Sequence, residues 1–200
     1  MVFMIKKEKN MIKEDCDVDV KKEDKYNEEY YYKILNKNRT ILLFDEINTT
    51  SADMLISKIK SMNFLDEKKE ITIELNSPGG DVACGFSIIN AIEQSKAPII
   101  TLVSGQVCSM AALIFITGKK RKMHYNSYAM FHPLSEGQAD YLQYIKDRTK
   151  FLIELEKSMD KLCKKYTKFN TMDMHKMNAG ELWISAEQAV KKGICDEIIK

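Results

Sequence analysis

Residues 71–92, ITIELNSPGGDVACGFSIINAI, decide the fold class of this chain. Apolar and polar residues alternate over 71–75, which is the two-residue period of a strand with one buried face. Residues 76–80 break the strand with proline and two glycines. Apolar residues then recur at helical spacing over 82–92. The stretch therefore predicts a strand, a glycine-containing turn and an amphipathic helix.

The same unit recurs along the chain. Residues 98–103 are a second apolar strand, 104–106 resemble a turn, and 109–117 resemble a wholly buried helix that Gly118 closes in a left-handed conformation. Further strands are predicted at 40–44, 128–131 and 194–199, and an exposed basic turn is predicted at 119–122. Two further helices are predicted at 50–62, where Thr50 and Asp53 would form a capping box, and at 139–166. A short helix is predicted after Ser185, with Gln188 as the capping partner of Ser185 and Gly193 as the end of the helix. Alternating strands and helices predict an α/β fold with parallel strands and right-handed crossovers.

Length and charge distribution suggest one domain with a charged tail. The chain has 200 residues, enough for one sizeable core. Residues 1–33 hold eight lysines and nine acidic residues with few aliphatic ones. Such a stretch buries too little apolar surface to offset the entropy of ordering. We therefore expect a charged N-terminal tail over 1–33 and a folded domain over 34–200.

Composition excludes several classes of protein. The net charge is +2, from 31 basic and 29 acidic residues that are mixed along the chain, so no nucleic-acid-binding face is predicted. The longest apolar run, residues 110–117, is too short to cross a membrane. Five cysteines stand far apart without a C-x-x-C pair, which argues against disulfides and zinc and favours a reducing compartment such as the cytoplasm. We expect no metal and no cofactor.

Two glycine-containing turns, 76–80 and 105–109, are the candidate site. Each joins a strand to a helix, so each helix start directs free N–H groups outward, and two such starts side by side can hold an oxyanion. The donors would be the backbone amides of Gly80 and Met110. Gly80 suits this role because a residue without a side chain lets a substrate approach closely.

A serine and a histidine complete the candidate chemistry. Ser109 begins a helix, and a serine needs a base to become nucleophilic at neutral pH. Among His124, His132 and His175, only His132 ends an apolar strand and enters a loop, a common location for a catalytic group. The pattern alone equally allows a helix-capping serine and a hydrogen-bonded histidine at a strand end. Cys108 is a weaker candidate nucleophile, because a small cysteine in apolar surroundings is usually inert.

Four blocks of sequence, in this order, resemble those of one enzyme family. They are residues 76–80 (NSPGG), 105–112 (GQVCSMAA), 130–134 (MFHPL) and 185–189 (SAEQA). They are similar to the NSPGG, GQAASMGA, MIHQP and SAxEA motifs of ClpP, the proteolytic subunit of the ATP-dependent Clp protease. The resemblance covers residues 34–199 and keeps the family's interval between Gly80 and Ser109.

The resemblance implies a fold and a set of roles. The fold would be the ClpP/crotonase-like spiral of repeated β-β-α units, with the long helix from Ala139 protruding as the handle that joins two rings. Ser109 falls on the family's nucleophile and His132 on its general base. Gly80 and Met110 fall on its oxyanion-hole amides. Residues 135–140 match the segment on which substrate adds as a strand.

The third triad position departs from the family pattern. The family has aspartate four residues before the serine of its SAxEA block, and this chain has Glu181 there. Glutamate can orient the base in some hydrolases, so Glu181 is the predicted acid. Asp173 is an alternative without a positional argument. Smaller departures are Ala111 in place of glycine, Pro133 directly after the histidine, and an N-terminus without the family's axial-loop sequence, on which docking of the ATPase depends.

The resemblance implies a serine endopeptidase subunit of a self-compartmentalised protease. Its partners would be further copies in stacked rings, unfolded polypeptides and an AAA+ Clp ATPase, with no nucleic acid and no membrane. The alternatives are a non-catalytic assembly subunit and a phage-type capsid-processing peptidase. Two further alternatives share the spiral fold: a signal-peptide-peptidase-like enzyme with a serine–lysine dyad, and a crotonase that binds acyl-CoA.

Overall fold

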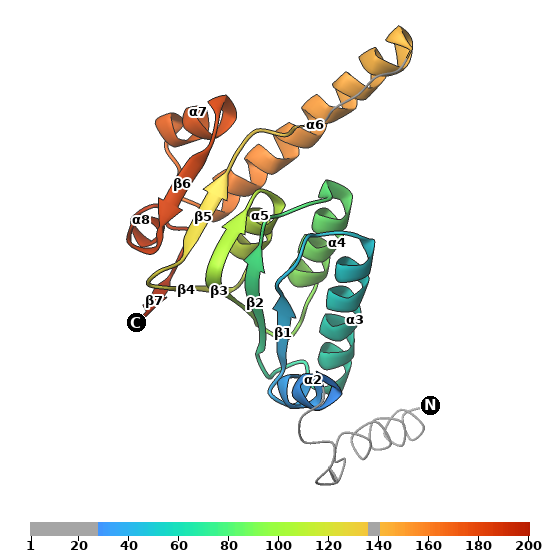
Figure 1. Cartoon of the computed structure of the whole chain (residues 1–200), viewed down its shortest axis with the longest axis vertical. Coiled ribbons are helices and arrows are strands. Elements are labelled where there is room, and N and C mark those ends of the chain that lie inside the picture. Colours follow the sequence, from blue (N-terminus) through green and yellow to red (C-terminus); the bar gives the residue numbers. More distant parts are fainter. Residues whose placement is uncertain (1–27, 136–140) are drawn as a thin grey trace.

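The computed structural model describes residues 28–135 and 141–200, which form a mixed α/β structure (Figure 1). The helices of this part are α2 (Glu28–Lys37), α3 (Thr49–Leu65), α4 (Val82–Glu93), α5 (Met110–Ile116), α6 (Leu142–Tyr166), α7 (Thr171–Ala179) and α8 (Ala186–Lys191). The strands are β1 (Thr40–Leu43), β2 (Ile71–Ser77), β3 (Ile99–Cys108), β4 (Lys120–His124), β5 (Tyr128–Phe131), β6 (Leu182–Ser185) and β7 (Glu197–Ile199). The predicted α/β class is confirmed.

The sheet is parallel except at one edge. Strands β1, β2, β3, β4 and β7 are neighbours in that order, and all four pairings are parallel. The ten-residue strand β3 forks the sheet: residues 100–103 pair with β4, and residues 106–108 pair with β5. Strand β6 is antiparallel to β5. The far end of β3 thus carries a branch of the same sheet, formed by β5 and β6, and β5 leads into His132.

The core is built around α5 and the central strands. All seven residues of α5 are buried, as the unbroken apolar run predicts. The side chains of β2 alternate between buried and half-buried, and α3 turns Ala52, Leu55, Ile59 and Met62 inward at helical spacing. Helices α3 and α4 pack together beside β1 and β2 (Figure 1). Ser109, directly before α5, is therefore anchored to the best-packed part of the molecule.

Two predicted turns are strands. Residues 104–106 lie within β3, because the strand continues past them to pair with β5. Residues 120–122 lie in β4, where Lys120 and Lys122 form ion pairs with Glu197 of β7. Both segments are too polar to indicate a strand by periodicity. Their neighbours in the sheet decide their conformation.

Two predicted local details are also wrong. The capping box of α3 is formed by Asn48 and Ser51 instead of Thr50 and Asp53. Gly118 is not left-handed, and its constraint is space: a Cβ there would lie 2.3 Å from Thr101 Oγ1. Gly193 does adopt a positive φ of 65° directly after α8, and Ser185 and Gln188 form the predicted capping box of that helix.

Three elements have weak sequence signals. Helix α7 and strand β6 were not predicted, because α7 is polar and β6 has only four residues. Helix α2 begins inside the stretch predicted as a tail. Residues 1–27 lie outside the described part, so the boundary of the tail at residue 33 stays a prediction.

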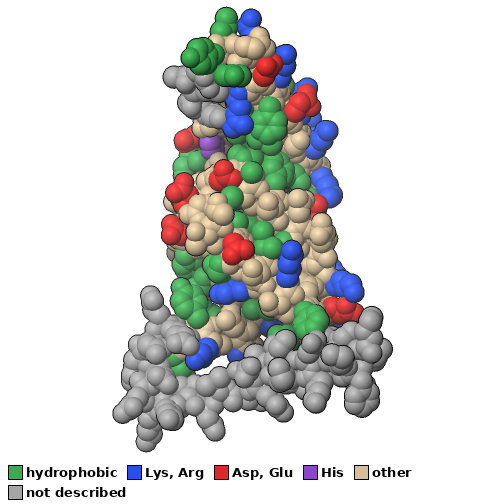
Figure 2. All heavy atoms as spheres, turned by 90° about the vertical axis from the view of Figure 1, so that its right-hand side faces the viewer, with side chains coloured by type: hydrophobic (Ala, Val, Ile, Leu, Met, Phe, Trp, Pro, Cys, Tyr) green, Lys and Arg blue, Asp and Glu red, His purple; other side chains and the backbone are tan. Residues whose placement is uncertain are grey.

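The described surface carries both signs of charge. Figure 2 shows the face formed by α3 and α4, on which basic and acidic side chains both occur between hydrophobic ones. None of the helices in the described part combines the length and the apolar composition that crossing a membrane requires. The described residues also contain no group of three or more His, Cys, Asp and Glu side chains that could hold a metal ion.

Candidate active site

Ser109 occupies a strained one-residue junction between β3 and α5. Its φ of 56° and ψ of −125° are unusual for a residue with a side chain, and such strain concentrates at functional sites. The surrounding structure holds the junction: the Ser109 N–H donates to the Met130 carbonyl at 2.8 Å, and the Ser109 carbonyl accepts from Ala112 N–H at 3.0 Å. The sharp turn from strand to helix resembles the way hydrolases present a nucleophile.

The turn over residues 76–80 packs directly against Ser109. Gly79 has a φ of 98°, and a Cβ there would lie 2.6 Å from the Cys108 carbonyl and 2.8 Å from Ser109 Cβ. No larger residue fits without moving the serine. The two strand-to-helix junctions proposed from sequence are thus neighbours, although only the first is a multi-residue turn.

The backbone amides of Gly80 and Met110 are both available as donors. Ile47 donates to the Gly79 carbonyl and accepts from Asp81 N–H, both at 2.7 Å. In this bridge the intervening Gly80 N–H points away from Ile47. Within the described ranges neither the Gly80 N–H nor the Met110 N–H donates a hydrogen bond. Gly80 needs to be glycine because the Ile47 carbonyl would lie 2.3 Å from a Cβ. The sequence predicts the same glycine for a different reason, the close approach of a substrate.

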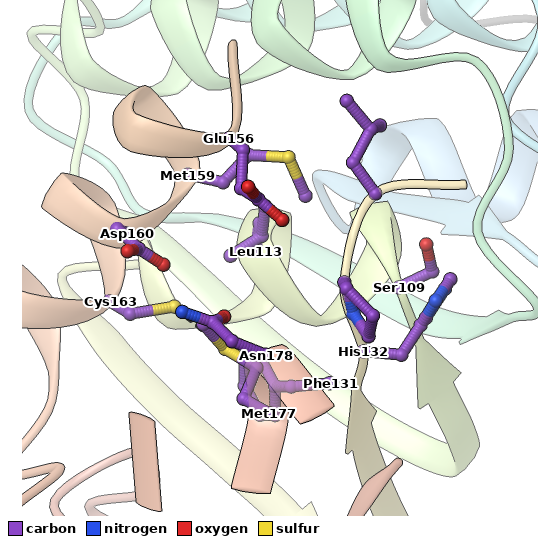
Figure 3. Close-up of a pocket in the computed structure, with 12 residues that line it drawn as sticks. Ser109, Leu113, Phe131, His132, Glu156, Met159, Asp160, Cys163, Met177 and Asn178 are labelled. Carbon is purple, nitrogen blue, oxygen red and sulfur yellow. Dashed lines mark hydrogen bonds between the residues drawn. The ribbon is translucent and has the colours of Figure 1, made fainter. Parts of the chain in front are cut away.

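His132 follows the last residue of β5 and lies beside Ser109. Both side chains line one pocket, on the same side of it (Figure 3). The two are not hydrogen-bonded to each other in the described structure. His124 ends β4 next to β7, and His175 is exposed on α7; neither lines this pocket. His132 is therefore the histidine that the fold brings to Ser109.

Glu181 is near His132 in the backbone, but its side chain is engaged elsewhere. In the antiparallel pair of β5 and β6, Phe131 faces Leu182 at the end of the ladder, so His132 and Glu181 are the next residues beyond that end. The exposed Glu181 carboxylate accepts a hydrogen bond from Trp183 Nε1 at 2.8 Å. Glu181 and Trp183 share one face of the chain because side chains alternate along a strand. The pairing of β5 with β6 thus brings the backbones of Glu181 and His132 near each other, but the Glu181 side chain is bonded to Trp183.

The charge of Glu181 also acts on Cys108, the last residue of β3. Burial raises the pKa of the Cys108 thiol, and the negative charge of Glu181 raises it further. A buried thiol with a raised pKa is a poor nucleophile. The electrostatics at this position therefore favour Ser109 over its neighbour Cys108.

Asp173 is committed to another task. Its carboxylate accepts from the Asn170 N–H at the start of α7 at 3.2 Å and forms an ion pair with Lys192. Burial opposes ionisation of Asp173, but the Lys192 and Asn170 contacts outweigh it and lower the pKa of the carboxyl. Asp173 caps a helix and ties α7 to α8, which explains its burial without a role in the triad.

A family comparison extends over most of the chain. The model of the Clp protease family matches residues 22–200, which include all four sequence blocks, Ser109, His132 and Glu181. The chain belongs to the Clp protease family. Members of this family are ClpP-type peptidases, and the mixed α/β fold with its seven-stranded sheet is consistent with theirs. The resemblance stated from sequence is confirmed at the level of family and fold.

The pocket beside Ser109 in this Clp protease family member was not anticipated from sequence. Its walls come from the start of α5, the end of β5, α6 and α7 (Figure 3). Besides Ser109 and His132, the lining residues are Leu113, Phe131, Pro133, Leu134, Glu156, Met159, Asp160, Cys163, Met177 and Asn178. The only advance signal was the apolar stripe of the long helix, which includes Met159 but identifies no pocket. The predicted substrate-addition segment, residues 135–140, lies outside the described residues except for Ser135.

Proposed function

We propose that this chain is a serine endopeptidase subunit in which Ser109 is the nucleophile, His132 the general base, and the Gly80 and Met110 amides the oxyanion hole. One observation supports this most strongly. Ser109 is held at a strained junction next to two backbone N–H groups that have no acceptor among the described residues, and His132 lines the same pocket. Acyl transfer requires these three elements together.

The chemistry follows from the arrangement. The Ser109 hydroxyl attacks the peptide carbonyl while His132 takes its proton, and the carbonyl oxygen becomes an oxyanion that accepts from Gly80 and Met110. The intermediate collapses as His132 protonates the leaving amine, which leaves an acyl group on Ser109. Water, deprotonated by His132, then hydrolyses this ester and regenerates the serine.

Glu181 acts in this scheme as the orienting acid. It would accept from the outer N–H of His132 and stabilise the imidazolium. The Trp183 Nε1–H competes for the same carboxylate. We therefore propose that a Glu181 rotamer released from Trp183 is the active one, and that the hydrogen bond to Trp183 marks a resting arrangement.

Covalent labelling tests the nucleophile. A fluorophosphonate probe should label the assembled wild-type protein, and Ser109→Ala should abolish the label. His175→Ala is a matched control, since His175 is exposed and outside the pocket. An assembled oligomer that takes no label would overturn the proposal and favour a non-catalytic assembly subunit.

The long helix supports self-association. Near its start Tyr141 is 79% exposed, Leu142 68% and Tyr144 61%, and hydrophobic side chains gather at this tip of the molecule (Figure 2). Exposed apolar clusters mark interaction sites. We propose that this handle joins copies of the chain into stacked rings that enclose Ser109, in the cytoplasm.

The enclosed chamber predicts which substrates are accessible. The isolated protein should cleave short peptides, whereas folded proteins should require an AAA+ Clp ATPase that unfolds and delivers them. Sedimentation velocity measures the assembly, and Leu142→Glu with Tyr144→Glu should shift it to smaller species. Degradation of a folded protein by the isolated chain would contradict the chamber.

A further inference from the structure

The pocket beside Ser109 continues between α5 and α6 as a narrow slot. Leu113, Met159 and Met177 supply apolar walls, and Ser109 and His132 stand on one side of it. A group that lies against Ser109 during acylation would extend into this slot. In a peptide substrate, that group is the side chain preceding the scissile bond.

The side of the slot opposite Ser109 is acidic. Glu156 and Asp160 lie four residues apart on α6, and both line the slot (Figure 3). In the described part of the chain, neither carboxylate has a lysine, arginine or histidine nitrogen within 4.0 Å. Like charges at this spacing destabilise a helix. Among the described residues, no ion pair offsets this repulsion.

One of the carboxylate oxygens is buried without a partner. Asp160 Oδ1 is solvent-inaccessible and has no hydrogen bond, alone among the buried side-chain oxygens and nitrogens of the described residues. A buried polar atom left without a hydrogen bond destabilises the folded protein. Such an atom in a pocket wall points to a ligand that supplies the missing donor.

We propose that this slot binds a lysine or arginine side chain of the substrate, and that the peptidase cleaves after basic residues. The aliphatic stem would pack on Leu113, Met159 and Met177, and the cationic end would meet Asp160 and Glu156. An acid at the foot of a side-chain pocket is a known means of selecting lysine and arginine. This inference rests on the proposed peptidase function.

The surroundings of the slot fit a cation. Burial raises the pKa of the neighbouring Cys163 thiol to about 12, with the negative charge of Asp160 adding to the effect. The cysteine is therefore neutral and leaves the two carboxylates as the charges that face the slot. A desolvated ion pair with good geometry discriminates strongly between a cationic and an apolar side chain.

The slot is narrow, so its walls must move apart to admit a side chain. The enclosed space is about 10 Å³, room for one water molecule. An unbranched lysine stem requires the least widening among large side chains. Met159 and Met177 are suited to give way, because methionine has three rotatable bonds and adapts its shape. A single trapped water on Asp160 Oδ1 is the competing occupant.

Matched peptide substrates test the specificity. Coumarin amides that differ only in lysine or leucine before the scissile bond should give a lysine preference in kcat/KM of about tenfold or more. Asp160→Asn should lower the lysine-to-leucine ratio by about tenfold or more, since it removes the charge and keeps the shape. Asp147→Asn is the control, because Asp147 lies on the same helix but is exposed and paired with Lys150. A leucine preference in the wild type, or an unchanged ratio in Asp160→Asn, would overturn the inference.

A binding experiment separates this inference from the peptidase proposal. Butylammonium, which mimics a lysine side chain, should bind to Ser109→Ala and measurably less to Ser109→Ala with Asp160→Asn in calorimetry. Binding without any fluorophosphonate labelling of the wild type would sink the peptidase proposal but keep the cation slot. Labelling without butylammonium binding would do the reverse and assign Asp160 Oδ1 to a trapped water.

Discussion

The two ends of the proposed triad are held in different ways. Ser109 precedes a helix whose seven residues are all buried, and its N–H is bonded to the neighbouring strand. Glu181 precedes a four-residue edge strand, is exposed, and is fixed by one hydrogen bond to Trp183. The nucleophile is thus positioned by the core, and the acid is positioned by surface contacts that other contacts can replace.

This difference says where variation is tolerated. A substitution at Ser109, or at a residue packed against it such as Gly79, must disturb packed backbone. A substitution at Glu181 alters only side-chain contacts beside the edge strand β6. Replacing aspartate by glutamate, the main departure from the family motif, falls at the end where the structure is least constrained. The following experiments test this division, from the largest expected effect to the smallest.

Removing the base should have the largest effect. His132→Ala should lower kcat for peptide hydrolysis by at least ~10³-fold, because general base catalysis supplies up to about 10⁴-fold. Steady-state hydrolysis of a short fluorogenic peptide measures it. His175→Ala, on the exposed face of α7, should retain wild-type activity. An equal loss of kcat in His132→Ala and His175→Ala would contradict a specific role of His132 in catalysis.

Crowding the serine from the side should come next. In Gly79→Ala the new Cβ meets the Cys108 carbonyl at 2.6 Å and Ser109 Cβ at 2.8 Å, at a φ of 98°. A displacement of about 1 Å costs about 100-fold in rate, so a loss of that size is expected. Gly180→Ala is the control, because no described residue lies within 4 Å of its Cβ and its φ of 173° is extended.

Chemical denaturation of both glycine variants measures how much each substitution lowers the free energy of unfolding. Gly79→Ala should lose about 1–3 kcal/mol of unfolding free energy, and Gly180→Ala should stay within about 0.5 kcal/mol of wild type. An active and stable Gly79→Ala protein would show that the serine junction is as adaptable as the Glu181 edge.

Changes at the acid should have a smaller effect. Glu181→Gln should lower kcat about 10–100-fold if the carboxylate orients His132, an effect limited by its loose attachment. Trp183→Phe removes the competing donor and should leave activity unchanged or raise it severalfold. Hydrolysis of the same peptide measures both. A Trp183→Phe variant as impaired as Glu181→Gln would mean that the tryptophan contact positions the acid productively.

The smallest effect should concern stability alone. The pKa of Asp173 is lowered in the folded protein, so its contribution is present above its ordinary pKa of about 3.8 and is lost as the pH falls through the folded value. Asp173→Asn should therefore cost about 1–2 kcal/mol at pH 7, and the cost should shrink below pH ~3.8. Urea denaturation at pH 7 and pH 3 measures it. A cost that does not depend on pH would show that the charge of the Asp173 carboxylate does not contribute to it.

The predictable part of the fold depended on strong local patterns. The strand, turn and helix over residues 71–92 and the buried helix after Ser109 have regular apolar spacing, and both are found in the structure. Residues 104–106 and 120–122 were mistaken for turns because polar residues in strands are stabilised by partners far along the chain. Local patterns do not contain that information.

The sequence by itself determined the family, the order of the motifs and which serine and histidine are the candidates for catalysis. The residue types of a motif and the number of residues between motifs can be read from the chain without knowing how it folds. Only the tertiary structure decided that Glu181 is bonded to Trp183, that Asp173 belongs to a helix cap, and that Asp160 enters the pocket beside Ser109. Each of these facts depends on which side chains from distant segments meet, and that is settled by packing.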